Sequence, residues 1–496
     1  MNLFDALENE MNYGLTENGA VKHITTKNAI LDMFAMCGSY RNRSDEDCIV
    51  AFKKALAEDV SLAIKCLFYI ADCRGGQGER RFFRVCFRWL AIEHTKVARR
   101  NLKAIPTYRR WDDVLYACID TPLEKDALQF IKEQLILDVN SKTPSLLAKW
   151  LPSENASSKE TKKVASIVRE YLGFSHRQYR KTLTELRSRI KIVETLMSQN
   201  RWDEIEFDKI PSRAGLFYKN AFARRDIISK KYEAFINNKN TKVNAAVLNP
   251  VDIANRAFRL CGCDYKSTER KALQKYWDNL PNYYGDKIEN AIAVVDVSGS
   301  MSGTPMGAAV SLGAYIAEKT NGIFKNKFIT FSSDPRLVRF EGVDIVDKFN
   351  RARNAEWGSS TNIEKTFDLL LNTAIANSVP KEEMPERLYI FSDMEFDAGL
   401  GLTSKWGWCR QRYSTSNKDT LFESIAKKWA AYGYDLPPVI FWNLDARTQN
   451  IPAIGGRYSY ISGFSPVMIE TILSGKTGWD LCLEKLLGSG RYDPVY

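Results

Sequence analysis

Oxygen-bearing side chains follow a short apolar run in the second half of the chain. The run Ala291–Val295 leads into Asp296, and Ser298 and Ser300 follow at alternate positions. A carboxylate and two hydroxyls at the end of a buried strand are hard oxygen ligands, which suit Mg²⁺ or another hard divalent cation better than zinc. This segment therefore predicts a cation site.

Two further polar segments occur at equivalent places. Thr361 lies just before a predicted helix, and Asp393 directly follows the apolar run 387–392. Either residue alone is explained by helix capping or a turn. Together with the first segment they predict a metal site of low charge, with room for water and for a carboxylate or phosphate from a partner, made of Asp296, Ser298, Ser300, Thr361 and Asp393.

The elements around these residues alternate between strand and helix from residue 288 onward. Apolar strand candidates are 291–296, 326–331, 387–392 and 436–441, and helix candidates between them are 305–320, 361–377 and 419–433. Short buried strands separated by helices predict a parallel, doubly wound, Rossmann-like sheet. Ligands bind such sheets at the carboxyl ends of the strands, where the polar segments lie.

The first half of the chain has a different pattern. Apolar residues at spacings of three and four over 47–73 and in later stretches predict amphipathic helices, and strand-type alternation is almost absent before residue 288. A glycine-rich break at 74–81 separates two helical runs, as in an αα-hairpin. We expect stacked HEAT-like helical pairs in a domain spanning 1–285, and a second domain spanning 286–496.

Charge also differs between the halves. Residues 1–285 hold 48 Lys and Arg against 35 Asp and Glu, a net charge of +13, whereas residues 286–496 have a net charge of −2. Basic clusters with interleaved aromatic residues favour RNA binding, and an ordinary solvated basic surface is the alternative. The predicted RNA-binding residues are Arg74, Arg80, Arg81, Arg84, Arg109, Arg110, Lys159, Lys162, Arg177 and Arg180.

Several classes of protein are disfavoured by what the sequence lacks. The first twenty residues have no signal-peptide pattern, and no uncharged apolar run approaches the ~18 residues that span a bilayer, so we expect a cytoplasmic protein without membrane contact. Three histidines and the absence of a P-loop argue against histidine-based catalysis and a P-loop ATPase. A metal-dependent hydrolase using Asp296 and Asp393 stays open, but we expect no enzyme.

The Asp-x-Ser-x-Ser segment, followed by a distant Thr and a distant Asp, resembles the von Willebrand factor A domain and its metal-ion-dependent adhesion site over about residues 286–496. The resemblance implies that Ser298, Ser300 and Thr361 bind the ion directly, and that Asp296 and Asp393 bind it directly or through water. It also implies partner binding through the ion rather than chemistry. The loop Gly-Ser-Ser-Thr361 differs from the commoner Gly-Gly-Thr of that family.

A helical-repeat body ahead of such a domain resembles the TROVE-module, Ro-type ribonucleoproteins, which bind small structured RNAs and misfolded RNA. The segments RGGQGERR, RRWDDVL, AKWLPSENASS and YRKTLTELR are similar to a related, less characterised family found in bacteria, viruses and plants. The resemblance implies a non-enzymatic RNA-binding scaffold whose second domain binds a partner through a divalent metal. The alternative is a metal-dependent protein–protein interaction module without RNA.

Overall fold

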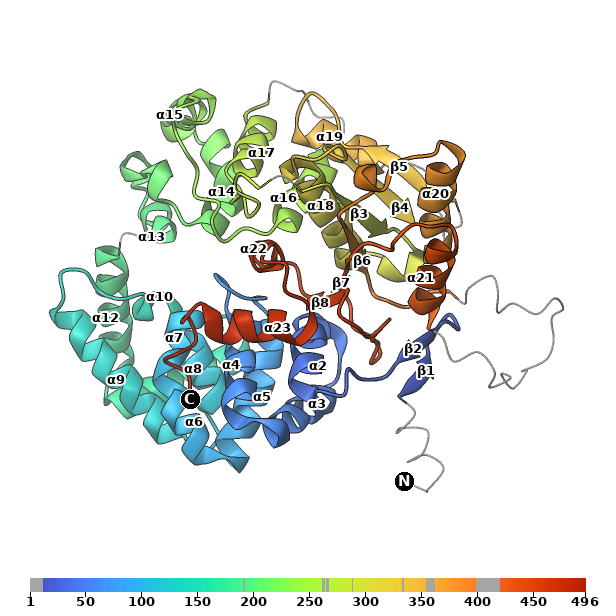
Figure 1. Ribbon diagram of the computed structural model, residues 1–496. Helices are drawn as coiled ribbons and strands as arrows, with labels where there is room; N and C mark the ends of the chain where they lie inside the picture. Colours follow the sequence, from blue (N-terminus) through green and yellow to red (C-terminus); the bar gives the residue numbers. More distant parts are fainter. Residues whose placement is uncertain are drawn as a thin grey trace.

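The computed structural model describes residues 12–190, 192–260, 264, 267–287, 289–331, 334–353, 362–397 and 420–496. The described chain has a helix-rich N-terminal part and, toward the C-terminus, a mixed sheet of six strands with helices around it (Figure 1). This confirms the predicted change from helices to alternating strands and helices.

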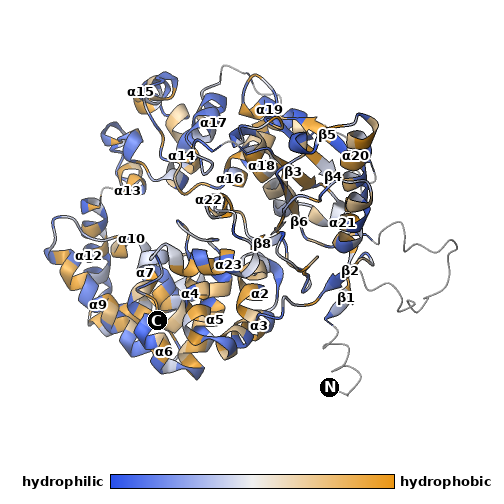
Figure 2. Cartoon of the chain, viewed as in Figure 1, coloured by the Kyte–Doolittle hydropathy of each residue, from blue (hydrophilic) through white to orange (hydrophobic). Residues whose placement is uncertain are grey.

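The helices of the N-terminal part are mostly short and amphipathic, and Figure 2 shows polar and apolar stripes along them. Their bounds are α2 Ala29–Met36, α3 Asp45–Glu58, α4 Val60–Ala71, α5 Arg80–Glu93, α6 Thr95–Asn101, α7 Ile105–Tyr108, α8 Trp111–Cys118, α9 Glu124–Asn140, α10 Leu147–Trp150, α11 Lys159–Leu172, α12 His176–Arg189, α13 Val193–Ser198, α14 Ser212–Arg224, α15 Asp226–Asn237, α16 Pro250–Ala257 and α17 Thr268–Asp278.

The helical run predicted over 47–73 is two helices, because Asp59 ends one and begins the next. Asp59 has an extended backbone, and its side chain accepts a hydrogen bond from the Leu62 amide at the start of α4. Ser44 begins α3 with a capping box that includes Asp47. These side chains satisfy backbone amides that a helix leaves free at its first turn.

The C-terminal sheet has the strand order β5-β4-β3-β6-β7-β8. All neighbours are parallel except β4 and β5, which are antiparallel. The strands are β3 Ala291–Asp296, β4 Lys327–Phe331, β5 Arg336–Arg339, β6 Arg387–Ser392, β7 Val439–Asn443 and β8 Tyr458–Ser462. The accompanying helices are α18 Thr304–Lys319, α19 Ile345–Arg353, α20 Ile363–Ala376, α21 Leu421–Ala431, α22 Met468–Ile472 and α23 Gly478–Leu483.

The four predicted strands are confirmed, and the prediction missed the two edge strands. β5 is short and three of its four residues are exposed, so it lacks the apolar run that marks a buried strand. In β8, two serines interrupt the apolar run, although all five residues are buried. The antiparallel β5 also makes the sheet mixed rather than wholly parallel.

The prediction of a helical domain over 1–285 was wrong for the first described segment. Residues Tyr13–Leu15 and Val21–His23 pair as antiparallel strands β1 and β2. Gly19 makes the turn with a φ of +90°, which glycine adopts without the steric cost that other residues meet. We call residues 12–25 the N-terminal hairpin.

Both ends of the helical part contact the sheet part, so the helices form an arc that meets the sheet at each end (Figure 1). At one end α2 packs against β8 and α23, and at the other α16 packs against α18 and α19. The last residues of the chain return to the helices, where Arg491 pairs with the buried Asp72 and Tyr108 donates to the Arg491 carbonyl.

The glycine-rich break at 74–81 lies at this contact. A Cβ on Gly76 would lie 1.9 Å from the Tyr69 carbonyl oxygen, so only glycine fits there. The side-chain amide of the neighbouring Gln77 donates to the Phe34 carbonyl at 3.1 Å. A Cβ on Gly38 would collide with the Gln77 side chain. The segment therefore fixes how α2 and α4 pack beside the sheet. Across the described residues, we find no helix long and apolar enough to cross a membrane.

Candidate functional site

Asp296 ends β3 at the carboxyl edge of the sheet and is fully buried. Its Oδ1 accepts the Ser298 amide at 2.9 Å, and the hydroxyls of Ser298 and Ser300 lie 2.9 Å apart. Gly303, with a φ of +88°, turns the chain into α18. The predicted turn therefore places one carboxylate and two hydroxyls together, and of these only Ser300 is exposed.

Asp393 follows the adjacent strand β6 and is also buried. Ser392 links Asp296 to the turn that carries Asp393, because its hydroxyl donates to Asp296 Oδ2 at 2.5 Å and accepts the Met394 amide at 2.9 Å. Met394 has a φ of +67°, a conformation that is uncommon for a non-glycine residue. The chain reverses strand order between β3 and β6, which is where open α/β sheets bind ligands.

We call Asp296, Asp393 and the hydroxyls of Ser298, Ser300 and Ser392 the carboxylate centre. Burial, and then the nearby charge of Asp393, raise the pKa of Asp296 to about 7. Hydrogen bonds from Ser392 and Ser298 act in the opposite direction and only partly offset this rise. The centre therefore has less positive charge around it than its carboxylates require.

One guanidinium partly compensates this charge. Arg447 Nη2 lies 2.5 Å from Asp393 Oδ2, and Arg447 Nη1 lies 3.1 Å from Glu17 Oε2 in the N-terminal hairpin. The sequence analysis did not identify Arg447 or Glu17. Their positions, hundreds of residues apart with no motif around them, give no signal that could have found them.

The structure brings together four of the five predicted metal-binding residues, and Thr361 lies outside the described residues. Within the described ranges, no group of three or more His, Cys, Asp or Glu side chains could hold a metal ion. The centre instead offers two carboxylates and three hydroxyls, which are the hard oxygen donors that Mg²⁺ accepts. The donor set and the raised pKa of Asp296 fit a divalent cation.

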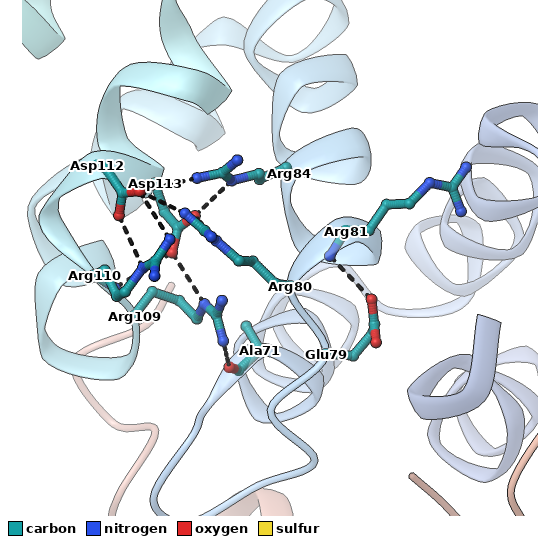
Figure 3. A network of polar contacts seen from close by, with 9 residues as sticks. All are labelled: Ala71, Glu79, Arg80, Arg81, Arg84, Arg109, Arg110, Asp112 and Asp113. Carbon is teal, nitrogen blue, oxygen red and sulfur yellow. Dashed lines mark hydrogen bonds and ion pairs between the residues drawn. The ribbon is translucent and has the colours of Figure 1, made fainter. Parts of the chain in front are cut away.

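Four of the predicted RNA-binding arginines form a network with two aspartates (Figure 3). Arg80 and Arg84 each contact both carboxylates, with Nε atoms 2.9 and 2.5 Å from Asp113 Oδ1. We call this set the arginine cluster: Arg80, Arg84, Arg109, Arg110, Asp112 and Asp113.

The arginine cluster is a compact, charge-compensated site. Arg109 is 6% exposed and also donates to the Ala71 carbonyl at 2.7 Å, which ties α8 to α4. Burial raises the pKa of Asp113, but Arg109, Arg84 and Arg80 together outweigh it, so that pKa lies below its ordinary value. The cluster therefore holds helices together, and its surplus positive charge faces the outside through Arg80, Arg84 and Arg110, which are about one-third to one-quarter exposed.

The other predicted RNA-binding residues are more accessible. Arg81 pairs with Asp45 and donates to the Arg43 carbonyl at 2.6 Å, whereas Arg74 is exposed. On α11 and α12, four cations are exposed and make no ion pair among the described residues: Lys159, Lys162, Arg177 and Arg180.

A groove of about 460 Å³ lies between α6 and α9, and the sequence analysis did not single it out. Four basic residues line it with Phe130 and Tyr171, against two acidic residues. Of the basic residues, Arg99 pairs with Asp126 and Lys103 with Glu133. Arg100 and Lys125 are exposed and make no ion pair within the described part of the chain.

Comparisons with known proteins divide the chain at the same place as its secondary structure. A domain of unknown function (DUF2828) matches residues 16–115 and 143–282, and another (DUF7788) matches residues 290–483. The crystal structure of the Ro (RSR) protein of Deinococcus radiodurans aligns with 94% of this chain and 100% of its own, at 10% identity and a TM-score of 0.39. The uncharacterized protein L728 of Acanthamoeba polyphaga mimivirus is 30% identical over 510 residues, which cover 94% of this chain and 85% of the mimivirus protein. The chain belongs to the same family as protein L728.

Proposed function

We propose that the chain is a non-enzymatic RNA-binding scaffold. The helical half binds structured or misfolded RNA, and the C-terminal half binds a partner through Mg²⁺ or a similar divalent cation. The observation that carries the RNA part is the +13 net charge of residues 1–285 beside the −2 of the remainder. Excess positive charge confined to one half favours a polyanionic ligand.

The contacts of the basic residues indicate where RNA would bind. Most guanidinium groups of the arginine cluster already pair with Asp112 and Asp113. Only the partly exposed sides of these arginines could therefore contact RNA. The cations of α11 and α12 keep their full charge in solvent, where phosphate contacts form readily. The groove between α6 and α9 adds Arg100 and Lys125 beside two aromatic rings on which a base could stack.

The metal part of the proposal rests on the carboxylate centre. Its Asp-x-Ser-x-Ser turn, its place at the switch point of the sheet and the single antiparallel strand β5 support a von Willebrand factor A-like domain. Asp296, Ser298, Ser300 and Asp393 would hold the cation, directly or through water. A bound cation would supply a Lewis-acidic position that a partner's carboxylate could occupy.

The RNA part is tested by filter binding to a small structured RNA over a range of salt concentrations. The variant K159Q/K162Q/R177Q/R180Q removes four exposed charges from α11 and α12. Each lost phosphate contact reduces the slope of log K against log[salt] by about 0.7–0.9, so four contacts reduce it by roughly 3. The matched control K325Q/K381Q/K427Q/K476Q removes four exposed lysines from the C-terminal half and should leave the slope unchanged.

Two results contradict different parts of this proposal. Binding no tighter than that of a neutral control protein contradicts RNA binding, and an equal loss of affinity in both quadruple variants contradicts the proposed contact surface. The second would mean that the RNA responds to overall charge and does not contact the α11–α12 surface.

A protein–protein interaction module without RNA is the second candidate, and exposed apolar side chains on α9 favour it. Ile136, Leu137 and Val139 are 54, 64 and 43% exposed. Clustered exposed apolar side chains are typical of protein contact surfaces. A protein partner that is retained after nuclease treatment, released by chelator and absent with Asp296→Ala would support this function over RNA binding.

A further inference from the structure

The N-terminal hairpin lies directly on the edge of the carboxylate centre. The Glu17 amide donates to Glu395 Oε2 at 2.8 Å, and the Asn18 side chain donates to the Glu395 carbonyl at 2.6 Å. The Thr16 hydroxyl donates to the Phe396 carbonyl at 2.6 Å. The hairpin therefore holds the residues that immediately follow Asp393.

A second loop completes this contact. His23 exchanges backbone hydrogen bonds with Ile451 at 2.9 and 3.0 Å, and the Lys22 ammonium donates to the Thr448 hydroxyl at 2.7 Å. Thr448 in turn donates to the buried Glu395. The loop that carries Arg447 is thus fixed to the hairpin by the Arg447–Glu17 ion pair and by the contacts of the residues that follow Arg447.

The same loop reaches the helical half. The Asn42 side-chain amide donates to Asp445 Oδ1 at 3.3 Å, and the Arg43 guanidinium donates to the Arg447 carbonyl. Both belong to the segment that follows α2, the short helix η1 Cys37–Asn42 and its C-cap. A displacement of Arg447 would therefore change contacts in the carboxylate centre, in the hairpin and in the segment after α2.

We infer that Arg447 and the N-terminal hairpin form a latch over the carboxylate centre, in which Arg447 competes with a divalent cation for Asp393. The inference rests on the metal part of the proposed function. With Arg447 at 2.5 Å, Asp393 Oδ2 already faces one cation, and a second cation beside it meets like-charge repulsion across a poorly screened site. Cation binding therefore moves Arg447 away and loosens its hold on Glu17.

The exposure of the two partners suits a reversible contact. The Arg447 side chain is 31% exposed and Glu17 is 46% exposed, so both charges regain water when they separate. The hairpin has only two strands of three residues each, and an isolated two-stranded hairpin is marginally stable in water. Once Arg447 is displaced, the remaining contacts are mostly hydrogen bonds to Glu395 and to the 448–451 loop.

The test uses the full-length protein, with Mn²⁺ as the probe. Free Mn²⁺ is measured by electron paramagnetic resonance, and hydrogen exchange is followed at the amides of Glu17 and His23. We expect Mn²⁺ to speed exchange at both amides in the wild type. Arg447→Gln should bind Mn²⁺ roughly tenfold more tightly, because a like charge beside the cation is removed, and its hairpin amides should exchange fast without metal.

Two controls accompany this variant. Arg457→Gln removes one charge at the opposite edge of the sheet, where Arg457 donates to the Leu436 carbonyl at 2.9 Å, and should match the wild type in both measurements. Glu17→Gln breaks the ion pair from the hairpin side. It should speed hairpin exchange without metal and leave Arg447 on Asp393.

Each other outcome overturns the latch in a distinguishable way. If Mn²⁺ binds but hairpin exchange is unchanged, and Arg447→Gln binds no tighter than Arg457→Gln, then the metal centre stands and the latch is wrong. If Arg447→Gln binds Mn²⁺ more weakly, Arg447 orients Asp393 for the ion instead of competing with it. If neither the wild type nor Arg447→Gln binds Mn²⁺, both the latch and the metal part of the proposed function are contradicted. The RNA part is tested independently by filter binding.

Discussion

The chain buries two pairs of carboxylates, one in the arginine cluster and one in the carboxylate centre, and the protein compensates them differently. Asp112 and Asp113 are surrounded by four guanidinium groups. Among the described residues, Asp296 and Asp393 have one, from Arg447, and otherwise contact hydroxyls and backbone amides. The pKa of Asp113 lies below its ordinary value, and that of Asp296 rises to about 7.

The difference separates a site whose charges are compensated within the folded chain from one whose charges are compensated only in part. A buried acid surrounded by fixed cations is complete in the folded chain, and removing it leaves the cations unpaired. A buried acid with too few cations costs stability until a ligand supplies the missing charge, and such perturbed groups cluster at functional sites. By this comparison the arginine cluster joins helices, whereas the carboxylate centre has uncompensated charge that the cation of the proposed function would balance.

The largest expected effect is the loss of an acid from the arginine cluster. Asp113→Asn should lower the free energy of unfolding by about 3–5 kcal/mol, because Arg80, Arg84 and Arg109 lose their shared buried partner. Urea denaturation measures this loss. The control Asp126→Asn removes an acid from the exposed pair with Arg99 and should cost less than about 1 kcal/mol. Equal losses in the two variants would show that the cluster is not a structural site.

The next largest effect is stabilisation by Mg²⁺, which should require the carboxylate centre. Mg²⁺ at one hundred times its dissociation constant should raise the free energy of unfolding by about 2.7 kcal/mol, since it binds the folded state alone. Asp296→Asn should abolish this gain, whereas the Asp126→Asn control should keep it. Thermal unfolding with and without chelator gives the measurement. A gain of the same size in Asp296→Asn would mean that Mg²⁺ acts elsewhere on the protein.

A smaller effect follows from the raised pKa of Asp296. Its folded-state pKa of about 7 exceeds the ordinary value of 3.8, so the metal-free protein binds an extra proton between these values and loses stability as the pH rises through this window. Asp296→Asn should therefore stabilise the metal-free protein at pH 8 by about 1 kcal/mol, roughly 1 °C in Tm for a chain of 496 residues. The gain should vanish near pH 4, where the wild-type carboxyl is protonated in the folded state.

The lowered pKa of Asp113 gives the opposite dependence. Its stabilisation is present above the unfolded-state pKa and is lost as the pH falls through the lower folded-state pKa. In chelator, both Asp296→Asn and Asp113→Asn should therefore converge on the wild type in acid and diverge from it toward neutral pH, Asp296→Asn as the more stable and Asp113→Asn as the less stable protein. Profiles that diverge from the wild type in the same direction would remove the electrostatic distinction between the two sites.

The sequence could predict residues placed by the order of strands and helices, but not residues placed by loops or by the sheet edges. Asp296, Ser298, Ser300 and Asp393 could be placed together because parallel strands end at a common edge, a rule that needs only the order of the elements. Arg447 could not be placed, because its contact with Glu17 joins residues 430 positions apart through loops with no periodic pattern. Edge strands β5 and β8 lacked the continuous apolar run of the inner strands.

The basic residues show a second limit of the sequence. Counting charge identified the helical half correctly as basic, but a count cannot distinguish Arg109, buried against Asp113, from Arg177, exposed on α12. Asp112 and Asp113 stand in the same RRWDDV segment as two of the arginines they bind. Adjacent acids within a basic segment are therefore a signal of internal pairing that charge counts overlook.

The smallest expected effect is the stability cost of removing Arg110, which tests whether the arginine cluster has more guanidinium groups than its two acids require. Arg110 is one-third exposed and lies over the Trp150 ring at 4.2 Å, and three other arginines remain for Asp112 and Asp113 when it is removed. Arg110→Gln should therefore cost only ~0.5 kcal/mol in urea denaturation, in the range of exposed ion pairs. Arg109→Gln, at a 6% exposed position, should cost clearly more, because the Ala71 carbonyl and Asp113 both lose a donor. If Arg110→Gln were as costly as Arg109→Gln, all four guanidinium groups would be needed to compensate the two acids, and the cluster would have no surplus charge to offer RNA.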